Sequence, residues 1–197
     1  MNDQFKTQVN SKYAFYRTHY VNNDDKLIEV DNLYKQREVY VSTANMYTIF
    51  PFWDVSMSYD FQWNEMKADM YGFVFPTRFT NLLSIATALR LGKVKLQGSG
   101  LATFVNDRVK EGPAPKARQI LTPAVFLSYK LFDKHDFSLR AFYKKTFRMP
   151  TFNDLYYADM GNSKLDPEYV TQYNLGTVYQ KQWGNKLFRH FKIQRTA

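Results

Sequence analysis

The chain alternates apolar and polar residues with a period of two over long stretches, and this alternation constrains its fold more than any other feature. The clearest stretch is residues 53–64, WDVSMSYDFQWN, in which every odd-numbered residue is apolar or aromatic and every even-numbered residue is polar. Because successive side chains of a β-strand point to opposite faces, such a strand has one apolar and one polar face. Residues 137–147 repeat the pattern, with Lys145 and Phe142 as exceptions, and residues 169–180 repeat it again. The sequence therefore predicts an all-β protein.

We predict an antiparallel up-and-down meander of about eight long strands, with a ninth beginning near Leu187. Many of these strands exceed the usual length of about 5–6 residues in globular sheets. The strands are expected at residues 5–21, 36–49, 53–66, 77–91, 93–106, 119–132, 136–147 and 168–182.

The connections between the predicted strands alternate between long and short along the chain. A meander with all its long loops at one end and its tight turns at the other is typical of a transmembrane β-barrel of the outer membrane. A soluble up-and-down barrel or sandwich is the alternative, since its loop lengths need not sort by end. The long connections are residues 22–35, 67–76, 107–118 and 148–167, and the short ones are residues 50–52, 92, 133–135 and 183–186.

Aromatic residues of matching parity lie ten residues apart on three of the predicted strands. These pairs are Trp53 and Trp63, Phe137 and Phe147, and Tyr169 and Tyr179. At about 3.3 Å per residue and a tilt near 40°, ten residues rise about 25 Å along a barrel axis. This rise equals the height of the lipid-facing band between the two aromatic girdles of such barrels. We therefore interpret the six residues as an aromatic girdle in contact with outer-membrane lipid.

The composition excludes several classes of protein. The chain has 197 residues and no cysteine, which excludes disulfide scaffolds, thiolate zinc sites and cysteine nucleophiles. Its mean hydropathy is −0.50, and no stretch approaches the run of about 20 apolar residues that a spanning helix needs. Aromatic residues make up 18% of the chain, a content that argues against disorder.

No catalytic, cofactor-binding or metal-binding motif is found. The histidines, His19, His135 and His190, lack metal-ligand spacing and are interpreted as surface residues. The chain contains no nucleophile elbow, zinc-protease or phosphate-loop pattern. The net charge is +9, but Lys and Arg are scattered over strand ends and loops. We therefore expect neither an enzyme nor a nucleic-acid partner.

The segment 144–176, KKTFRMPTFNDLYYADMGNSKLDPEYVTQYNLG, contains four ordered elements: residues 147–156, 161–162, 165–168 and 173–176. Two prolines bracket a long loop, and residues preceding proline are pushed toward extended geometry. Residues 152–157 can form one helical turn, and Gly161-Asn162 is a turn signal. The residues that carry this motif are Arg148, Pro150, Phe152, Asn153, Leu155, Tyr156, Gly161, Asn162, Leu165, Pro167 and Glu168. Our interpretation is that the motif shapes the loop and the start of the next strand.

These elements resemble the late-barrel motif of TonB-dependent outer-membrane receptors, especially those of the Bacteroidetes type. The resemblance implies a plugged transporter of the Gram-negative outer membrane. Its partners would be a plug domain, the remaining barrel strands, TonB and a small nutrient ligand such as an iron chelate, cobalamin or a glycan fragment. It also implies that residues 67–76, 107–118 and 148–167 are the segments nearest to the ligand.

The chain shows no recognisable plug domain, and its last residues, LFRHFKIQRTA, do not alternate. We therefore expect residues 1–187 to be a partial barrel from the later half of such a receptor, and residues 188–197 to be an atypical basic tail. On this interpretation the piece is not functional alone. A complete eight-stranded barrel that serves as an adhesin or structural anchor is one alternative. A soluble basic β-domain that binds nucleic acid is another.

Overall fold

A computed structural model describes residues 4–22, 30–112, 114–132, 136–157, 161–182 and 190–196. These residues contain nine strands and one short helix. In chain order the elements are β1 (Phe5–Asn22), β2 (Val30–Phe50), β3 (Trp53–Ala68), β4 (Thr77–Leu91), β5 (Val94–Arg108), β6 (Arg118–Lys130), β7 (Asp136–Arg148), α1 (Phe152–Tyr156), β8 (Glu168–Gln182) and β9 (His190–Thr196).

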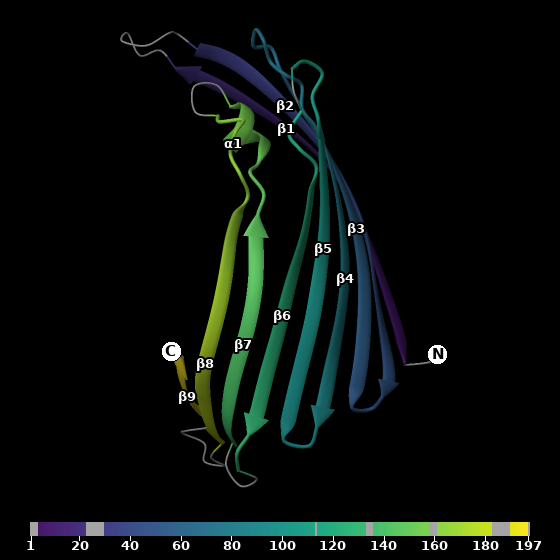
Figure 1. Cartoon of the computed structure of the whole chain (residues 1–197), viewed down its shortest axis with the longest axis vertical. Helices are drawn as coiled ribbons and strands as arrows, with labels where there is room; N and C mark the ends of the chain where they lie inside the picture. Colours follow the sequence, from purple (N-terminus) through teal and green to yellow (C-terminus); the bar gives the residue numbers. More distant parts are fainter. Residues whose placement is uncertain are drawn as a thin grey trace.

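All nine strands lie in one sheet in the order of the sequence, β1 to β9, and each pairs antiparallel with its neighbours. This confirms the predicted all-β meander. Figure 1 shows the strands side by side, with α1 and the long connections at one end of the sheet and the short turns at the other. We call these the loop end and the turn end. Among the described residues, no helix is long and apolar enough to cross a membrane.

Two strands differ from the predicted boundaries by more than two residues. β2 begins at Val30 rather than at residue 36, because it stays paired with β1 as far as the Asn22–Val30 pair. The ninth strand, β9, begins at His190 and pairs with β8, so residues 190–196 of the expected basic tail lie in a strand. Leu187 and His135 lie outside the described residues.

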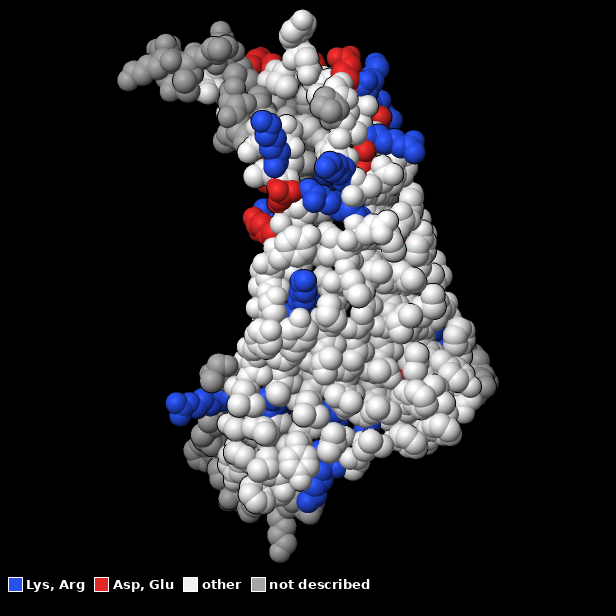
Figure 2. Space-filling model, in the orientation of Figure 1, with Lys and Arg blue, Asp and Glu red and all other residues white. Residues whose placement is uncertain are grey.

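The register sorts the side chains onto two faces. We call the face that carries Trp53 and Tyr59 the outer face, and the face that carries Asp54 and Asp60 the inner face. The outer face exposes large apolar side chains on strands far apart in the sheet, such as Tyr13 (67% exposed), Leu121 (66%) and Tyr173 (76%). Figure 2 shows that charged side chains gather near the two ends of the molecule and leave an almost uncharged band between them.

The predicted girdle residues occupy two levels of the outer face. Phe147 pairs with Tyr169 near the loop end, with 6.4 Å between ring centroids, and Phe137 pairs with Tyr179 near the turn end. On β3, Trp63 lies toward the loop end, opposite Phe79, and Trp53 lies toward the turn end, opposite Leu89. Their contact with lipid stays a prediction.

Lys145, the charged exception on the outer face of β7, lies at the loop-end level. Its ammonium group is 5.9 Å from the ring centroid of Tyr169. A long basic side chain can lie along apolar surface and carry its charge to the end of that surface, which explains how a lysine is accommodated there.

The main buried apolar cluster lies at the loop end. It consists of Tyr34 from β2, Met66 from β3, Phe73 from the β3–β4 connection and Phe152 from α1. The loop that contains α1 therefore packs against strands and a loop from the first half of the chain. This packing, rather than strand pairing, fixes its position.

Candidate functional site

Three of the predicted long connections, residues 67–76, 107–118 and 148–167, meet at the loop end. Phe73 of the β3–β4 connection and Phe152 of α1 share the buried cluster. The Lys110 backbone N–H donates to the Val74 carbonyl at 2.9 Å, which joins the β5–β6 connection to the β3–β4 connection. An ion pair between Arg118 and Asp166 joins the β5–β6 side to the loop after β7. The three segments therefore form one loop assembly.

Arg78 on β4 anchors this assembly to the inner face. Its Nε and Nη2 each donate to a carboxylate oxygen of Asp107 on β5 at 2.6 Å. Its remaining nitrogen, Nη1, donates to the Pro150 carbonyl at 2.6 Å. The guanidinium carbon also lies 5.2 Å from the ring centroid of Phe152. Arg78 therefore contacts three parts of the protein: β5 through Asp107, the start of the β7–β8 loop through Pro150, and α1 through Phe152.

The first half of the predicted motif packs around this anchor. Pro150 is buried and gives its carbonyl to Arg78, while Phe152 and Leu155 are the buried residues of α1. Asn153 is exposed, and its carbonyl accepts a hydrogen bond from the Tyr157 backbone. Two of the four helix positions in the motif, Phe152 and Leu155, are therefore packing positions, and Asn153 supplies a backbone acceptor.

Tyr156, the last helical motif residue, turns its phenol toward the anchor. Its hydroxyl is buried and has no hydrogen-bond partner among the described residues. Burial raises the pKa of the Tyr156 phenol, the Asp107 carboxylate adds to that rise, and Arg78 opposes it. The next residue, Tyr157, stacks on Tyr34 with 4.6 Å between ring centroids.

The helix begins with a reciprocal cap. The Thr151 side chain accepts from the Asp154 backbone N–H at 3.2 Å, and the Asp154 carboxylate accepts from the Thr151 backbone N–H at 2.8 Å. These hydrogen bonds to Thr151 hold the pKa of the Asp154 carboxyl below its usual value, and Arg148 adds a smaller effect in the same direction. The cap explains how a five-residue helix forms at a position where the sequence predicts a single turn.

The second half of the motif folds the loop back onto α1. The Gly161 N–H donates to the Tyr157 carbonyl at 2.8 Å, and the Asn162 N–H donates to the Asp154 carbonyl at 2.9 Å. A Cβ atom at position 161 would lie 2.7 Å from the backbone N and O of Tyr157, so close approach requires glycine there. The Leu165 N–H then donates to the Asn162 carbonyl at 3.2 Å.

The end of the motif leads into β8. Pro167 is buried, whereas Leu165 is 45% exposed. Arg148 and Glu168 face each other as the pair that starts the β7–β8 ladder, and their side chains form an ion pair at 3.4 Å. This half of the motif therefore leads the chain back into the sheet, where β8 pairs with β7.

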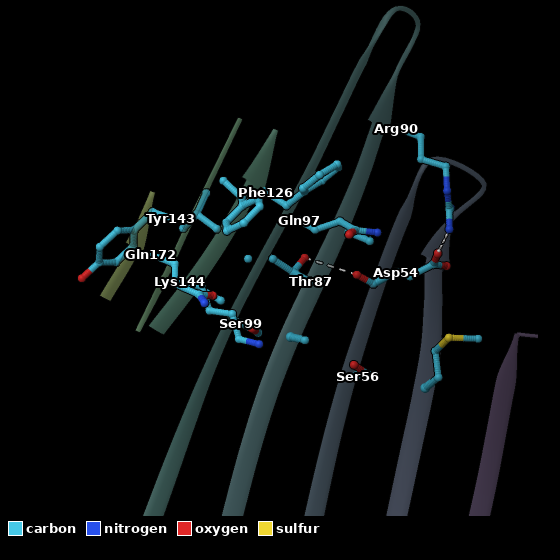
Figure 3. A pocket seen from close by; sticks show the side chains of 17 residues that line it. Asp54, Ser56, Thr87, Arg90, Gln97, Ser99, Phe126, Tyr143, Lys144 and Gln172 are labelled. Carbon is cyan, nitrogen blue, oxygen red and sulfur yellow. Dashed lines mark hydrogen bonds and ion pairs between the residues drawn. The ribbon is translucent and has the colours of Figure 1, made fainter. Parts of the chain in front are cut away.

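Two hollows lie on the inner face. The loop-roofed hollow, of about 490 Å³, lies on β2–β5 beneath residues 148–152. The mid-wall hollow, of about 690 Å³, lies nearer the turn end. Figure 3 shows the mid-wall hollow, in which Arg90 pairs with Asp54 and Lys144 projects beside Ser99.

Sequence reasoning missed Arg78 and Asp107. Arg78 lies at the start of the predicted strand 77–91, and Asp107 comes directly after the predicted strand 93–106. Their opposite charges, both on the inner-face parity and close to the loop end, are the signal that could have found them. The described residues contain no group of three His, Asp or Glu side chains that could hold a metal ion. His19 contacts the Asp31 carboxylate at 2.5 Å, and both side chains are exposed.

The protein is a single antiparallel sheet with one apolar face, one polar face and its long loops at one end. These features define its class as part of the wall of a β-barrel. Residues 2–189 match a family model described as TonB dependent receptor-like, beta-barrel, and the chain belongs to this family. Barrels of this family are outer-membrane receptors and transporters of Gram-negative bacteria rather than enzymes. The resemblance seen in the sequence is thereby confirmed at the level of the family.

Among solved structures, the chain is similar to one titled "Copper transporter OprC", with a TM-score of 0.68 and 14% sequence identity. The match covers 91% of this chain and 35% of that chain, so the chain spans about a third of that protein's length. At this identity the likeness concerns the fold. A comparison with curated proteins gave no match.

Proposed function

We propose that the chain forms part of the wall of an outer-membrane receptor that takes up a small nutrient with energy supplied through TonB. The observation that carries this proposal is the separation of faces across nine antiparallel strands, in a chain whose family is that of TonB-dependent receptor barrels. The apolar outer face suits lipid, and the polar inner face suits a plug domain and a passing ligand. No residue of the chain is proposed to carry out a chemical reaction.

The two edge strands of the sheet, β1 and β9, each have one side on which a further barrel strand could pair. Among the described residues, β1 pairs only with β2, and β9 pairs only with β8. A closed eight-stranded barrel would pair β1 with β8, but β8 has β9 on that side. Since lipid cannot satisfy open strand edges, we propose that the remaining strands of a larger receptor cover both.

The loop assembly supports ligand capture at the outer surface. It brings together the connections 67–76, 107–118 and 148–167 at the end opposite the tight turns. In barrels of the outer membrane, the longer loops are extracellular and the tight turns are periplasmic. We therefore propose that a nutrient meets this assembly before it reaches the inner face.

Two adjacent substitutions on β8 test the membrane orientation. The chain has no cysteine, so Gln172→Cys and Tyr173→Cys each introduce a unique thiol. Position 172 is exposed on the inner face, and position 173 is exposed on the outer face. In isolated outer membranes, we expect a water-soluble maleimide to label only the Gln172→Cys variant. A fluorophore attached at position 173 in solubilised protein should then be quenched by brominated lipid after reconstitution.

Equal labelling of both variants by the water-soluble reagent, in protein recovered without detergent, would overturn the proposal in favour of a soluble β-domain. The nutrient-uptake step has a separate test. Cells that depend on this receptor should lose uptake when TonB is deleted, and uptake that survives the deletion would contradict the proposed supply of energy through TonB.

A further inference from the structure

A further hollow lies on the outer face at the loop end, and we call it the outer-face hollow. Its volume of about 450 Å³ falls within the range of about 300–1,000 Å³ that is usual for ligand pockets. Glu65, Thr77 and Arg108 lie side by side in one row of its wall, because Thr77 pairs with Glu65 on β3 and with Arg108 on β5. The other residues that line it are Lys67, Phe75, Val109 and Lys110. The outer-face hollow is therefore separate from both hollows of the inner face.

The backbone around Phe75 gives this hollow a fixed shape. Phe75 has a φ of 48°, a left-handed conformation that a bulky residue rarely adopts. Hydrogen bonds hold the residues on both sides of it. The Val74 carbonyl accepts from the Lys110 backbone N–H at 2.9 Å, and the Pro76 carbonyl accepts from the Met66 backbone N–H at 3.0 Å. Because a strained conformation persists only where its surroundings fix it, and such residues cluster at functional sites, Phe75 marks this hollow for attention.

The outer-face hollow carries an excess of positive charge. Glu65 forms an ion pair with Lys67 at 3.2 Å, so these two charges offset each other. Arg108 and Lys110 are exposed, and among the described residues neither forms an ion pair. Each cationic group lies over an aromatic ring instead, at 5.3 Å from the centroid for Arg108 and 5.4 Å for Lys110. The rings belong to Phe79 and Phe75, respectively. Such rings position the two cations without neutralising them.

A row of like charges continues the basic surface from this hollow toward β1. Lys35 on β2 lies directly opposite Arg17 on β1 and directly opposite Lys67 on β3, and all three side chains are exposed. Like charges in directly opposite positions destabilise a sheet. Figure 2 shows Lys and Arg side chains gathered at the loop end, beyond the almost uncharged band. An anionic layer in contact with the outer face at this level would offset the repulsion.

The level of the hollow along the barrel axis indicates where the anion comes from. In the proposed membrane orientation, Trp63 lies at the loop-end boundary of the lipid-facing band. Glu65 and Lys67 follow it on the same face of β3, about 5 and 10 Å further along the axis at about 3.3 Å per residue and a tilt near 40°. The polar headgroup layer occupies about 5–8 Å on each side of the hydrocarbon core. Lipid headgroups are therefore the chemical groups outside the barrel at this level, and basic pockets bind their anionic groups.

We propose that the outer-face hollow binds the phosphate group of a membrane lipid. Arg108 and Lys110 donate hydrogen bonds to the phosphate oxygens, as cationic donors do to phosphate in proteins generally. The acyl chains extend from the hollow over the apolar outer face, past Trp63 and Phe79. This inference goes beyond nutrient uptake and rests on the membrane orientation given under the proposed function.

The test is native mass spectrometry of the receptor purified from outer membranes in detergent. The probes are dioleoyl phosphatidic acid, inorganic phosphate, and dioleoylglycerol, which has the same acyl chains as the phosphatidic acid but no phosphate. Phosphatidic acid should bind, and neither of the other probes should displace it at equal concentration. Arg108→Gln and Lys110→Gln should each weaken this binding about tenfold, because each removes a charge-assisted hydrogen bond to the phosphate. Both side chains are exposed, so neither change removes a buried contact.

Lys95→Gln is the matched control, because it removes the same charge from an exposed position of β5 on the inner face near the turn end. It should leave the affinity for phosphatidic acid unchanged. Absent binding, or binding that is equal in all three variants, would overturn the hollow as the site. Equal binding of dioleoylglycerol would show that the acyl chains alone are recognised, and equally tight binding of inorganic phosphate would replace the lipid by a free anion. Correct labelling of the β8 cysteines in the same preparation would show that the receptor assignment survives any of these failures.

Discussion

Arg78 and Asp107 face each other across β4 and β5 and form two hydrogen bonds of 2.6 Å each. Their side chains are only 9% and 4% exposed. A bidentate pair of this kind satisfies both carboxylate oxygens and leaves one guanidinium nitrogen for the Pro150 carbonyl. The pair therefore connects the barrel wall to a loop that lies 72 residues further along the chain.

Replacing the arginine in Arg78→Met should release the loop from the wall. The substitution leaves the Asp107 carboxylate buried without its partner, and removing one member of a buried pair costs about 3–5 kcal/mol. We expect faster cleavage of residues 148–167 by protease and a lower unfolding temperature on heated gels. Arg148→Met is the control, because the Arg148 side chain is 62% exposed and such ion pairs contribute about 0–1 kcal/mol. Equal sensitivity of the two variants would contradict the anchoring role of Arg78.

Phe152 should be the most sensitive position of the short helix. Its side chain is 4% exposed and packs in the cluster with Tyr34, Met66 and Phe73. Truncation in Phe152→Ala should cost about 3–5 kcal/mol through lost burial and the cavity that remains. The adjacent exposed position supplies the comparison, since Asn153→Ala should change stability by no more than about 0.5 kcal/mol. Denaturant unfolding of both variants in the same detergent measures the difference.

Much of the sheet could be predicted because alternation is a local property of the sequence. The strict pattern of residues 53–64 identifies β3 and both of its faces, and the alternating loop lengths identify the two ends. The start of β2 could not be predicted. Residues 30–35 are held in a strand by pairing with β1 and by burial of Tyr34 against residues distant in the sequence.

The candidate site was predictable only in part. Proline positions and the turn signal identify the loop between β7 and β8, and the Thr151 and Asp154 pair can be recognised as a capping box. That this loop folds onto Tyr34 and Phe73 depends on contacts between residues that are distant in the sequence. Such contacts have no signature in the local pattern of a single strand.

Replacing Gly161 by a residue with a side chain should destabilise the loop, because there is no room for a Cβ atom at this position. A Cβ atom there would lie 2.7 Å from the Tyr157 backbone N and O, closer than any ordinary contact. Gly161→Ala should therefore loosen the return of the loop onto α1 and increase protease cleavage within residues 148–167. Gly100→Ala is the control, since a Cβ at position 100 of β5 meets no atom within 4 Å. Similar cleavage of both variants would show that the loop can move to accommodate the methyl group.

Acid should weaken the helix cap through Asp154. Hydrogen bonds from Thr151 lower the pKa of the Asp154 carboxyl in the folded protein, compared with about 3.9 for an unperturbed aspartate. A group with a lowered folded pKa contributes stability that is fully present above the unfolded value and is lost as the pH falls through the folded value. Hydrogen exchange of the Thr151 and Asp154 amides should therefore stay slow from pH 7 to about pH 5 and lose protection progressively below about pH 4, after correction for intrinsic rates.

The Asp154→Asn variant isolates this effect, because its side chain keeps a cap acceptor but does not titrate. Its amides should be less protected at pH 7 than those of the unmodified protein, and their protection should change less between pH 5 and pH 3. Any acid response that arises outside the cap is common to both proteins and cancels in the comparison. An identical loss of protection in the two proteins would show that the acid sensitivity does not arise from Asp154.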